Sequence, residues 1–171
     1  MSEAAALLPT VQVWDQAQAF AAIGEAVWWI TMVDATLVRH HRGIYDTALA
    51  ARTAAERRAI EQTLAGLRFA RNWISRGAGP NDAIHAGTGN RRITQWRWKL
   101  IPEPALTWLP PSAQKWELAR YRAYQACVAG NTIGKTLGQA VNFLTCTGAT
   151  AASATDTAAH TRPAQLHGSQ P

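Results

Sequence analysis

Apolar residues recur at helical spacing from the start of the chain. Between residues 11 and 39, the large apolar side chains fall on one stripe at about 100° of rotation per residue. This stripe consists of Phe20, Ile23, Val27, Ile30, Leu37 and Val38. Asp34 lies inside it, and Gly43 follows a basic cluster at 39–42, which is typical of a helix end. The pattern predicts one long helix with a carboxylate on its apolar face.

A second helical pattern begins near Asp46 or Thr47, with a clearer start signal at Thr53, so that either the helix starts at Thr53 or a short helix precedes it. Thr53 and Glu56 have the spacing of a capping box, in which each side chain accepts a hydrogen bond from the other residue's backbone N–H. Arg71 interrupts the apolar stripe of this helix. The glycines and the proline that follow Ser75 end the helix. The stripe otherwise consists of Ile60, Leu64, Leu67 and Ile74.

An alternating segment follows a loop that spans residues 77–92 and is rich in Gly, Asn and Asp. From residue 93 to 100, Trp96 and Trp98 share one side while Arg97 and Lys99 occupy the other, which is the period of a β-strand. No obvious partner strand is present in the sequence. We therefore expect an extended arm that lies across the helices with its tryptophans packed inward.

Two further helices follow a proline-rich stretch. Ser112 predicts the N-cap of a third helix, which runs to Gly130, and a fourth starts at Asn131 or Thr132. The short break between them predicts a helical hairpin. Gly134 and Gly138, four residues apart, suggest a close helix contact. The predicted fold is all-α: an antiparallel bundle of four or five helices with an extended Trp-rich arm.

The segment 147–171 differs in composition from the rest of the chain. It contains small and polar residues and no aromatic side chain. Such a segment buries too little apolar surface to offset the entropy of ordering it. We therefore predict one helical domain over 1–146 and a disordered tail over 147–171.

Composition narrows the class of protein. A chain of 171 residues with 47% hydrophobic and 16% charged residues fits one globular domain and excludes a globally disordered or collagen-like protein. Glu25 and Asp34 break the longest apolar run, and the acidic start at Ser2-Glu3 is unlike a signal peptide. We expect a cytoplasmic protein without a membrane partner. Cys127 and Cys146 are too few for a disulfide framework or metal cluster, so we expect two buried free thiols and no metal or cofactor.

The net charge of +6 comes mostly from arginine, and it is compatible with a polyanionic partner. An arginine-rich coding bias explains the same charge without any ligand. Arg91, Arg92 and Arg97 interleave with Trp96 and Trp98, a composition suited to stacking on single-stranded nucleic acid. The alternative is that the tryptophans are buried and the cations are solvated.

The segment 66–76 carries the most informative motif. With the all-helical plan, it resembles the superfamily of higher eukaryotes and prokaryotes nucleotide-binding (HEPN) domains, helical bundles of which many are metal-independent RNases. The family motif is an Arg that is followed directly by a polar residue and, after four to six intervening positions counted from the Arg, by a His. Arg71 and Asn72 match the first two positions, whereas Arg76 occupies the earliest position of the histidine.

A second resemblance extends over roughly residues 15–146, to uncharacterised actinobacterial proteins with a HEPN-like interpretation. It rests on the order of short motifs along the chain. The matching residues are Arg71-Asn72, Trp96-Arg97-Trp98, Trp116-Glu117, Arg120-Tyr121-Arg122-Ala123-Tyr124 and Ala129-Gly130.

The missing histidine has a chemical consequence. An arginine stays protonated at any working pH and cannot accept a proton, whereas two arginines still form a phosphate clamp. We therefore expect no catalytic residue, no RNase activity, and a phosphate or nucleic-acid site that includes Arg71, Asn72 and Arg76. Five residues on an α-helix turn about 140°, which separates Arg76 from Arg71. The alternative role of Arg71 is a buried ion pair with Asp34, because both interrupt apolar stripes on helices expected to pack together.

Three functions stay open from the sequence. The first is a catalytically degenerate HEPN-like protein that binds RNA, a nucleotide or a protein partner, in the toxin–antitoxin or phage-defence setting that the resemblance implies. The second is a structural protein that forms a homodimer through the Trp-rich arm. The third is an active RNase with an atypical site that uses His40, His41 or His85.

Overall fold

The computed structural model describes residues 16–78, 80–87 and 95–160. The predicted all-α class is confirmed, with five helices of nine or more residues in the described part of the chain and one small sheet. The elements are α1 (Gln16–His40), α2 (Arg42–Ala50), α3 (Ala54–Trp73), a π-helical turn η1 (Ile74–Ala78), α4 (Pro80–Ala83), β1 (Ile84–Gly87), β2 (Gln95–Trp98), α5 (Pro111–Cys127) and α6 (Ile133–His160).

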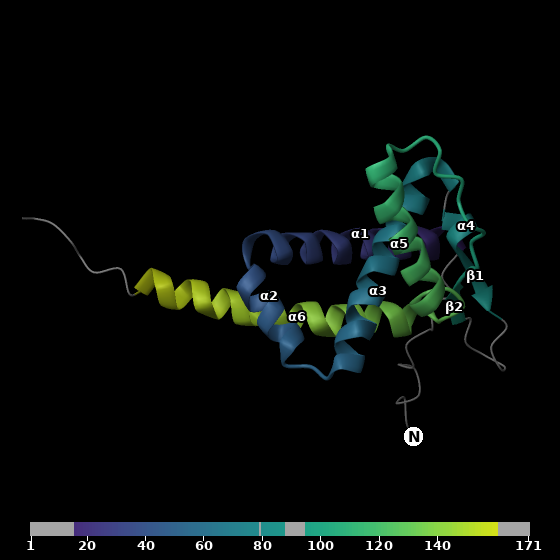
Figure 1. Cartoon of the computed structure of the whole chain (residues 1–171). Helices are drawn as coiled ribbons and strands as arrows, with labels where there is room; N and C mark the ends of the chain where they lie inside the picture. Colours follow the sequence, from purple (N-terminus) through teal and green to yellow (C-terminus); the bar gives the residue numbers. More distant parts are fainter. Residues whose placement is uncertain (1–15, 79, 88–94, 161–171) are drawn as a thin grey trace, which may run out of the picture.

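Helices α1 and α6 lie side by side along the length of the molecule, and α3 crosses them (Figure 1). Helix α5 packs antiparallel along α3, and this is the most extensive contact between two elements. The hairpin β1–β2 lies beside the turn that joins α5 to α6. The helices thus enclose one core, in which α3 packs most extensively against α5, α1 and α6.

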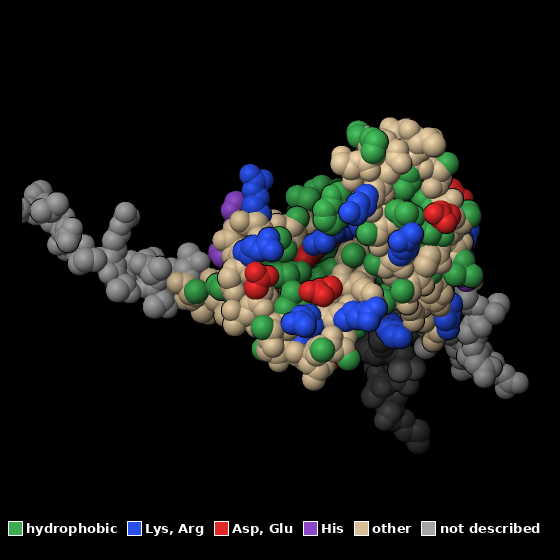
Figure 2. Space-filling view, viewed as in Figure 1, with side chains coloured by type: hydrophobic (Ala, Val, Ile, Leu, Met, Phe, Trp, Pro, Cys, Tyr) green, Lys and Arg blue, Asp and Glu red, His purple; other side chains and the backbone are tan. Residues whose placement is uncertain are grey.

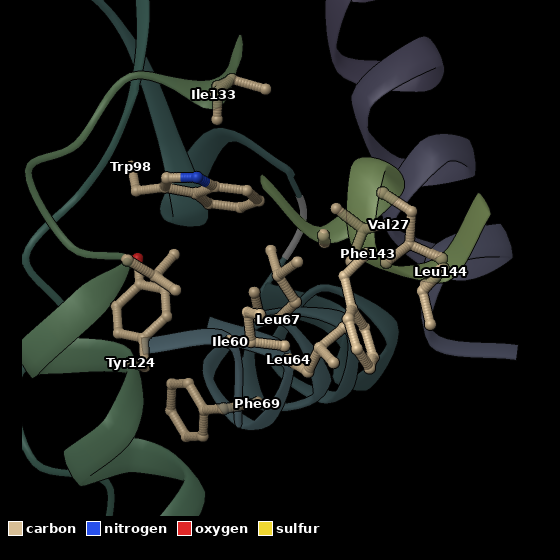
Figure 3. Packing of buried hydrophobic residues seen from close by; sticks show 14 of the residues in the cluster. Val27, Ile60, Leu64, Leu67, Phe69, Trp98, Tyr124, Ile133, Phe143 and Leu144 are labelled. Carbon is tan, nitrogen blue, oxygen red and sulfur yellow. The ribbon is translucent and has the colours of Figure 1, made fainter. Parts of the chain in front are cut away.

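The core contains several aromatic side chains that are held by hydrogen bonds as well as by packing (Figure 3). Trp98 is fully buried, and its indole N–H donates to Thr136 Oγ1 at 2.7 Å. Tyr124 is also fully buried; its hydroxyl donates to the Lys99 carbonyl at 2.6 Å, and its ring lies 5.3 Å from that of Phe69. These bonds tie β2 to both α5 and α6.

The sequence predicts capping residues at the starts of three helices, and the structure confirms some of them and not others. The capping box of α3 is confirmed, because Thr53 Oγ1 accepts from the Glu56 N–H and Glu56 accepts from the Thr53 N–H. Thr132 precedes α6, and its side chain accepts from Lys135 N at 3.4 Å. The predicted N-cap Ser112 is wrong, since α5 already begins at Pro111. Proline suits the first position of a helix, where its missing N–H removes no intrahelical bond.

The arm 93–100 has a partner strand, so the expectation of a lone extended segment is wrong. Strand β1 pairs antiparallel with β2, with Ile84 opposite Trp98 and Ala86 opposite Trp96. Four residues are too few for β1 to show an alternating pattern, and the sequence therefore placed them in a loop. The inward packing of the tryptophans is confirmed: Trp98 is buried, and Trp96 packs edge-on against Phe20 at 5.3 Å.

The predicted domain boundary at residue 146 falls inside α6, which continues to His160, so residues 147–160 of the predicted tail are helical. Thr147 and Ala151 are buried, and they lie four and eight residues after Phe143 on the inner face of α6. Small side chains suffice there because the end of α6 packs against α1 and α2. Residues 161–171 of the predicted tail and the predicted first turn of the N-terminal helix, 11–15, lie outside the described residues.

Helix α1 has the length and mean hydropathy of a membrane-spanning helix over Ala17–His40. Core helices of soluble proteins meet the same criterion, so the location of the protein stays a prediction. The helix carries exposed apolar side chains as well as buried ones. The exposed residues are Trp28, Trp29, Met32 and Val33.

Candidate phosphate-binding site

A buried carboxylate, Glu117 on α5, brings the motif residues of α3 together. Its side chain is 3% exposed and accepts hydrogen bonds from three residues. Arg76 Nη1 lies 3.1 Å from Oε1, Arg120 Nη1 lies 3.2 Å from Oε2, and Asn72 Nδ2 lies 3.2 Å from both oxygens. A buried charge of this kind is stable only when it is paired and hydrogen-bonded, and these donors provide both.

The helix geometry explains why these donors meet. Asn72 and Arg76 are four residues apart and therefore project from nearly the same face of the helix. Arg120 lies one turn after Glu117 on α5. Sequence reasoning cited Glu117 only as part of a short motif and missed this role. A signal existed: Glu117 precedes Tyr124 by seven residues and Val128 by eleven, which places it on the buried stripe of α5.

Arg71 does not pair with Glu117 and donates instead to Asn72 and to Thr31 of α1. Its guanidinium donates to Asn72 Oδ1 at 3.1 and 3.4 Å and to Thr31 Oγ1 at 3.3 Å. Both acceptors are neutral, and no Asp or Glu in the described ranges lies within salt-bridge distance of Arg71. Burial, and after it the positive charges of Arg120 and Arg68, lowers the pKa of the Arg71 guanidinium. The site therefore holds a half-buried cation beside other cations.

The prediction that Asp34 pairs with Arg71 is wrong, because a different arginine pairs with Asp34. Asp34 is fully buried, and it pairs with Arg68 and accepts from the Tyr45 hydroxyl at 2.8 Å. Helices α1 and α3 run antiparallel at this contact, so that Asp34 meets Arg68 while Thr31, one turn earlier, meets Arg71. Burial, with the adjacent Asp34 charge, raises the pKa of Tyr45, which keeps its hydroxyl a donor.

Arg76 has a second neighbour besides Glu117. Its guanidinium carbon lies 4.4 Å from the centre of the Trp108 ring, in cation–π geometry. Arg71 and Arg76 thus face different surroundings, as their separation along the helix suggests. The electrostatic neighbours of Arg71 are Arg120 and Arg68, which lower the pKa of its guanidinium, and Glu117, which acts in the opposite direction and less strongly.

The other predicted site residues lie away from Arg71 and Glu117 or outside the described residues. Arg97 donates to the Gly130 carbonyl at 2.9 Å and supports the turn before α6. Arg91 and Arg92 lie outside the described residues. His40 and His85 are exposed, and the described contacts of Arg71 and Glu117 include no histidine.

Metal-ligating and thiol groups are dispersed. Across the described residues, no three His, Cys, Asp or Glu side chains gather in a way that could hold a metal ion. Both cysteines are free thiols, as predicted, but their predicted burial is wrong. Cys127 is half-buried and donates to Gln62 Oε1 at 3.2 Å, whereas Cys146 is exposed.

Comparison of the chain with protein-family models, with curated proteins and with solved structures finds no match. The resemblance to HEPN domains therefore rests on the motif and the helical plan alone. Chemically, the site offers guanidinium and amide donors around two buried carboxylates. Lys and Arg side chains are spread over the face seen in Figure 2, with single Asp and Glu side chains between them. The arrangement can bind an anion through its guanidinium and amide donors.

Proposed function

We propose that this protein binds the phosphate groups of RNA or of a nucleotide at Arg71, as a catalytically degenerate HEPN-like protein that does not cleave its ligand. The observation that carries the proposal is the environment of Arg71. It is a half-buried guanidinium with hydrogen bonds to neutral acceptors alone among the described residues. A phosphate oxygen supplies the missing negative charge.

The charge balance around Arg71 supports an anionic ligand. The two buried carboxylates, Asp34 and Glu117, are paired with Arg68, Arg76 and Arg120. Arg71 adds a further positive charge, so the cluster has two more cations than anions. Arginine presents its donors in a planar fork that matches two phosphate oxygens, which lysine does not. The cluster is therefore suited to phosphate more than to a neutral ligand.

The same residues argue against cleavage. A metal-independent RNase needs a group that takes the proton of the attacking 2′-hydroxyl and one that gives a proton to the leaving oxygen. The histidine position of the motif holds Arg76, and Arg76 is engaged by Glu117 and Trp108. The toxin–antitoxin or phage-defence setting is part of the proposal and follows from the resemblance.

A structural, self-associating protein is the second candidate. The Trp-rich arm does not favour it, because Trp98 is buried and Trp96 packs against Phe20. Helix α1 favours it, since Trp28 and Trp29 are 46% and 58% exposed, with Glu25 as a charged neighbour that accepts from the Trp29 indole N–H. Large exposed apolar patches mark interaction surfaces in soluble proteins. Association of this kind is insensitive to the charge of Arg71.

Salt dependence of RNA binding separates the two candidates. Fluorescence anisotropy with a labelled single-stranded RNA should show an affinity that falls log-linearly with salt concentration. Arg71→Gln should weaken RNA binding about 10- to 100-fold, because losing one charge-assisted hydrogen bond changes the dissociation constant by about this factor. The matched control is Arg58→Gln, an exposed arginine on the same helix, which should weaken binding no more than about threefold.

Two outcomes would overturn the proposal. Equal losses for Arg71→Gln and Arg58→Gln would mean that binding reflects net charge alone. RNA cleavage by the wild type in the presence of a chelator, abolished by Arg71→Ala, would show an active RNase. Thermal unfolding of each variant checks that a loss of binding is not a loss of fold.

A further inference from the structure

A second concave site lies on the other side of Arg76, away from Arg71. It is a pocket of about 490 Å³ between the end of α3 and the segment that links β2 to α5. Arg76 is the charged residue in its lining, and the rest of the lining is apolar. The apolar lining consists of Phe69, Trp73, Pro104, Ala105, Leu106 and Trp108. A volume of this size accommodates a small organic molecule of two or three rings.

The inner wall of the pocket is a fixed aromatic surface. Phe69 and Trp73 lie one turn apart on α3 and stack with their rings 5.9 Å apart and inclined by 26°. Phe69 is buried, and Tyr121 supports it from behind at 5.4 Å. Phe69 therefore fixes the position of Trp73, which is half-buried and presents its apolar ring to the pocket.

The outer wall is held in place at both ends. The Ile101 carbonyl accepts hydrogen bonds from the Tyr121 hydroxyl and from Gln125 Nε2 on α5. At the other end, Gln114 Nε2 donates to the Leu109 carbonyl at 2.6 Å. Between these anchors, a turn in which Leu109 N donates to the Leu106 carbonyl at 2.9 Å carries Trp108. The pocket is thus built before any ligand arrives, which lowers the entropic cost of binding.

Arg76 gives the pocket its polarity. One of its terminal nitrogens pairs with Glu117, its guanidinium lies over the Trp108 ring, and its side chain is 37% exposed. Glu117 shares its single negative charge with Arg120 as well, so Arg76 is only partly neutralised. Arginine has five N–H donors, and the contact with Glu117 uses the donors of one nitrogen. The remaining donors are available to an acceptor at the pocket mouth.

We infer that this pocket binds a planar aromatic small molecule that carries a carboxylate. The rings lie between the Phe69–Trp73 pair and Trp108, and the carboxylate accepts hydrogen bonds from Arg76. The apolar walls exclude a highly polar ligand, and the partly neutralised arginine discriminates between an acid and its neutral analogue. This inference does not require phosphate binding at Arg71, because Arg71 does not line the pocket, although Arg76 belongs to the arginine cluster around Glu117 as well.

Calorimetric titration with 2-naphthoate and with the uncharged 2-naphthamide tests the inference directly. The acid should bind wild-type protein about tenfold more tightly than the amide. Arg76→Gln should reduce this ratio to about twofold or less, because the charged donor is gone. Trp108→Leu should weaken both ligands about tenfold by removing one aromatic wall.

Two control variants define what counts against the inference. Leu100→Ala removes a highly exposed apolar residue outside the pocket, and Arg58→Gln removes an exposed arginine of α3 that does not line it; both should leave the naphthoate affinity unchanged. Equal affinities of wild-type protein for acid and amide, or no binding of either at millimolar concentration, would overturn the inference. If Arg76→Gln does not fold, the wild-type preference for the acid over the amide still tests the charge, and Trp108→Leu tests the aromatic wall, since Trp108 has no hydrogen bond in the Glu117 network.

Discussion

Gly66 and Tyr124 bring α3 and α5 into close backbone contact. A Cβ added at Gly66 would lie 2.9 Å from Tyr124 Cα and 2.7 Å from Val128 Cγ2. Backbone atoms of α5 cannot move away as the end of a flexible side chain can. The missing side chain of Gly66 therefore sets the distance between the two helices, and with it the position of Glu117 relative to Asn72 and Arg76.

We expect Gly66→Ala to lower the free energy of unfolding by about 1–3 kcal/mol, the usual cost of overpacking a core. This loss should appear even though alanine is favoured over glycine in a helix by about 1 kcal/mol. Urea unfolding followed by circular dichroism gives the measurement. Gly138→Ala on α6 is the matched control: a Cβ there meets no atom within 4 Å, so stability should stay unchanged or rise. A stable Gly66→Ala protein would show that α5 can shift.

The two glycine predictions illustrate what the sequence can and cannot reveal. Gly134 and Gly138 have a suggestive spacing, yet a Cβ at either position meets no atom within 4 Å. Gly66 has no spacing signal and lies in an otherwise ordinary helix. Periodicity identifies the face of a helix that packs, but how closely a second helix approaches is set by the whole assembly.

Arg68→Met tests which arginine neutralises Asp34. Removing the guanidinium leaves a fully buried carboxylate with the Tyr45 hydroxyl as its remaining described partner. Breaking a buried pair from one side costs about 3–5 kcal/mol. The exposed part of Arg68 moderates this, so we expect a loss of about 3 kcal/mol in denaturant unfolding. Arg71→Met leaves no buried carboxylate without its partner, so it should lower the free energy of unfolding by about 1 kcal/mol or less. Equal losses would contradict the assignment.

The sequence predicts only part of the site around Asp34 and Glu117, because the packing of the helices decides which side chains meet. Asp34 stands out as a charge within an apolar stripe, and its burial follows from that pattern. Positions 68 and 71 lie about 60° apart around α3, and the rotation of the helix decides which of them faces Asp34. Glu117 was predictable in principle, because it occupies the buried stripe of α5, but its partners come from a distant segment. Contacts between segments depend on packing that no local pattern contains.

The capping box of α3 makes stability depend on pH. The side-chain and backbone hydrogen bonds from Thr53 lower the pKa of Glu56 in the folded protein. A carboxyl group with a lowered folded pKa stabilises the protein above its unfolded pKa of about 4.3, and this contribution is lost as pH falls through the folded value. Glu56→Gln should therefore lower the Tm at pH 7, and the difference from wild type should shrink as pH falls below about 4. A pH-independent difference would contradict the role of the charge. Glu103→Gln, an exposed carboxylate outside any helix, is the control.

Truncation within α6 tests how far the folded domain extends. A chain that ends at Cys146 loses Thr147 and Ala151, both buried, and uncovers the part of α1 around Leu37. The apolar surface involved is small, so we expect a loss of about 1–2 kcal/mol and a fall in Tm of roughly 2–8 °C. A chain that ends at His160 keeps these contacts and should melt at the wild-type temperature in the same differential scanning calorimetry experiment. If both truncated chains melt with the wild type, the end of α6 contributes nothing to stability and the boundary at residue 146 is correct after all.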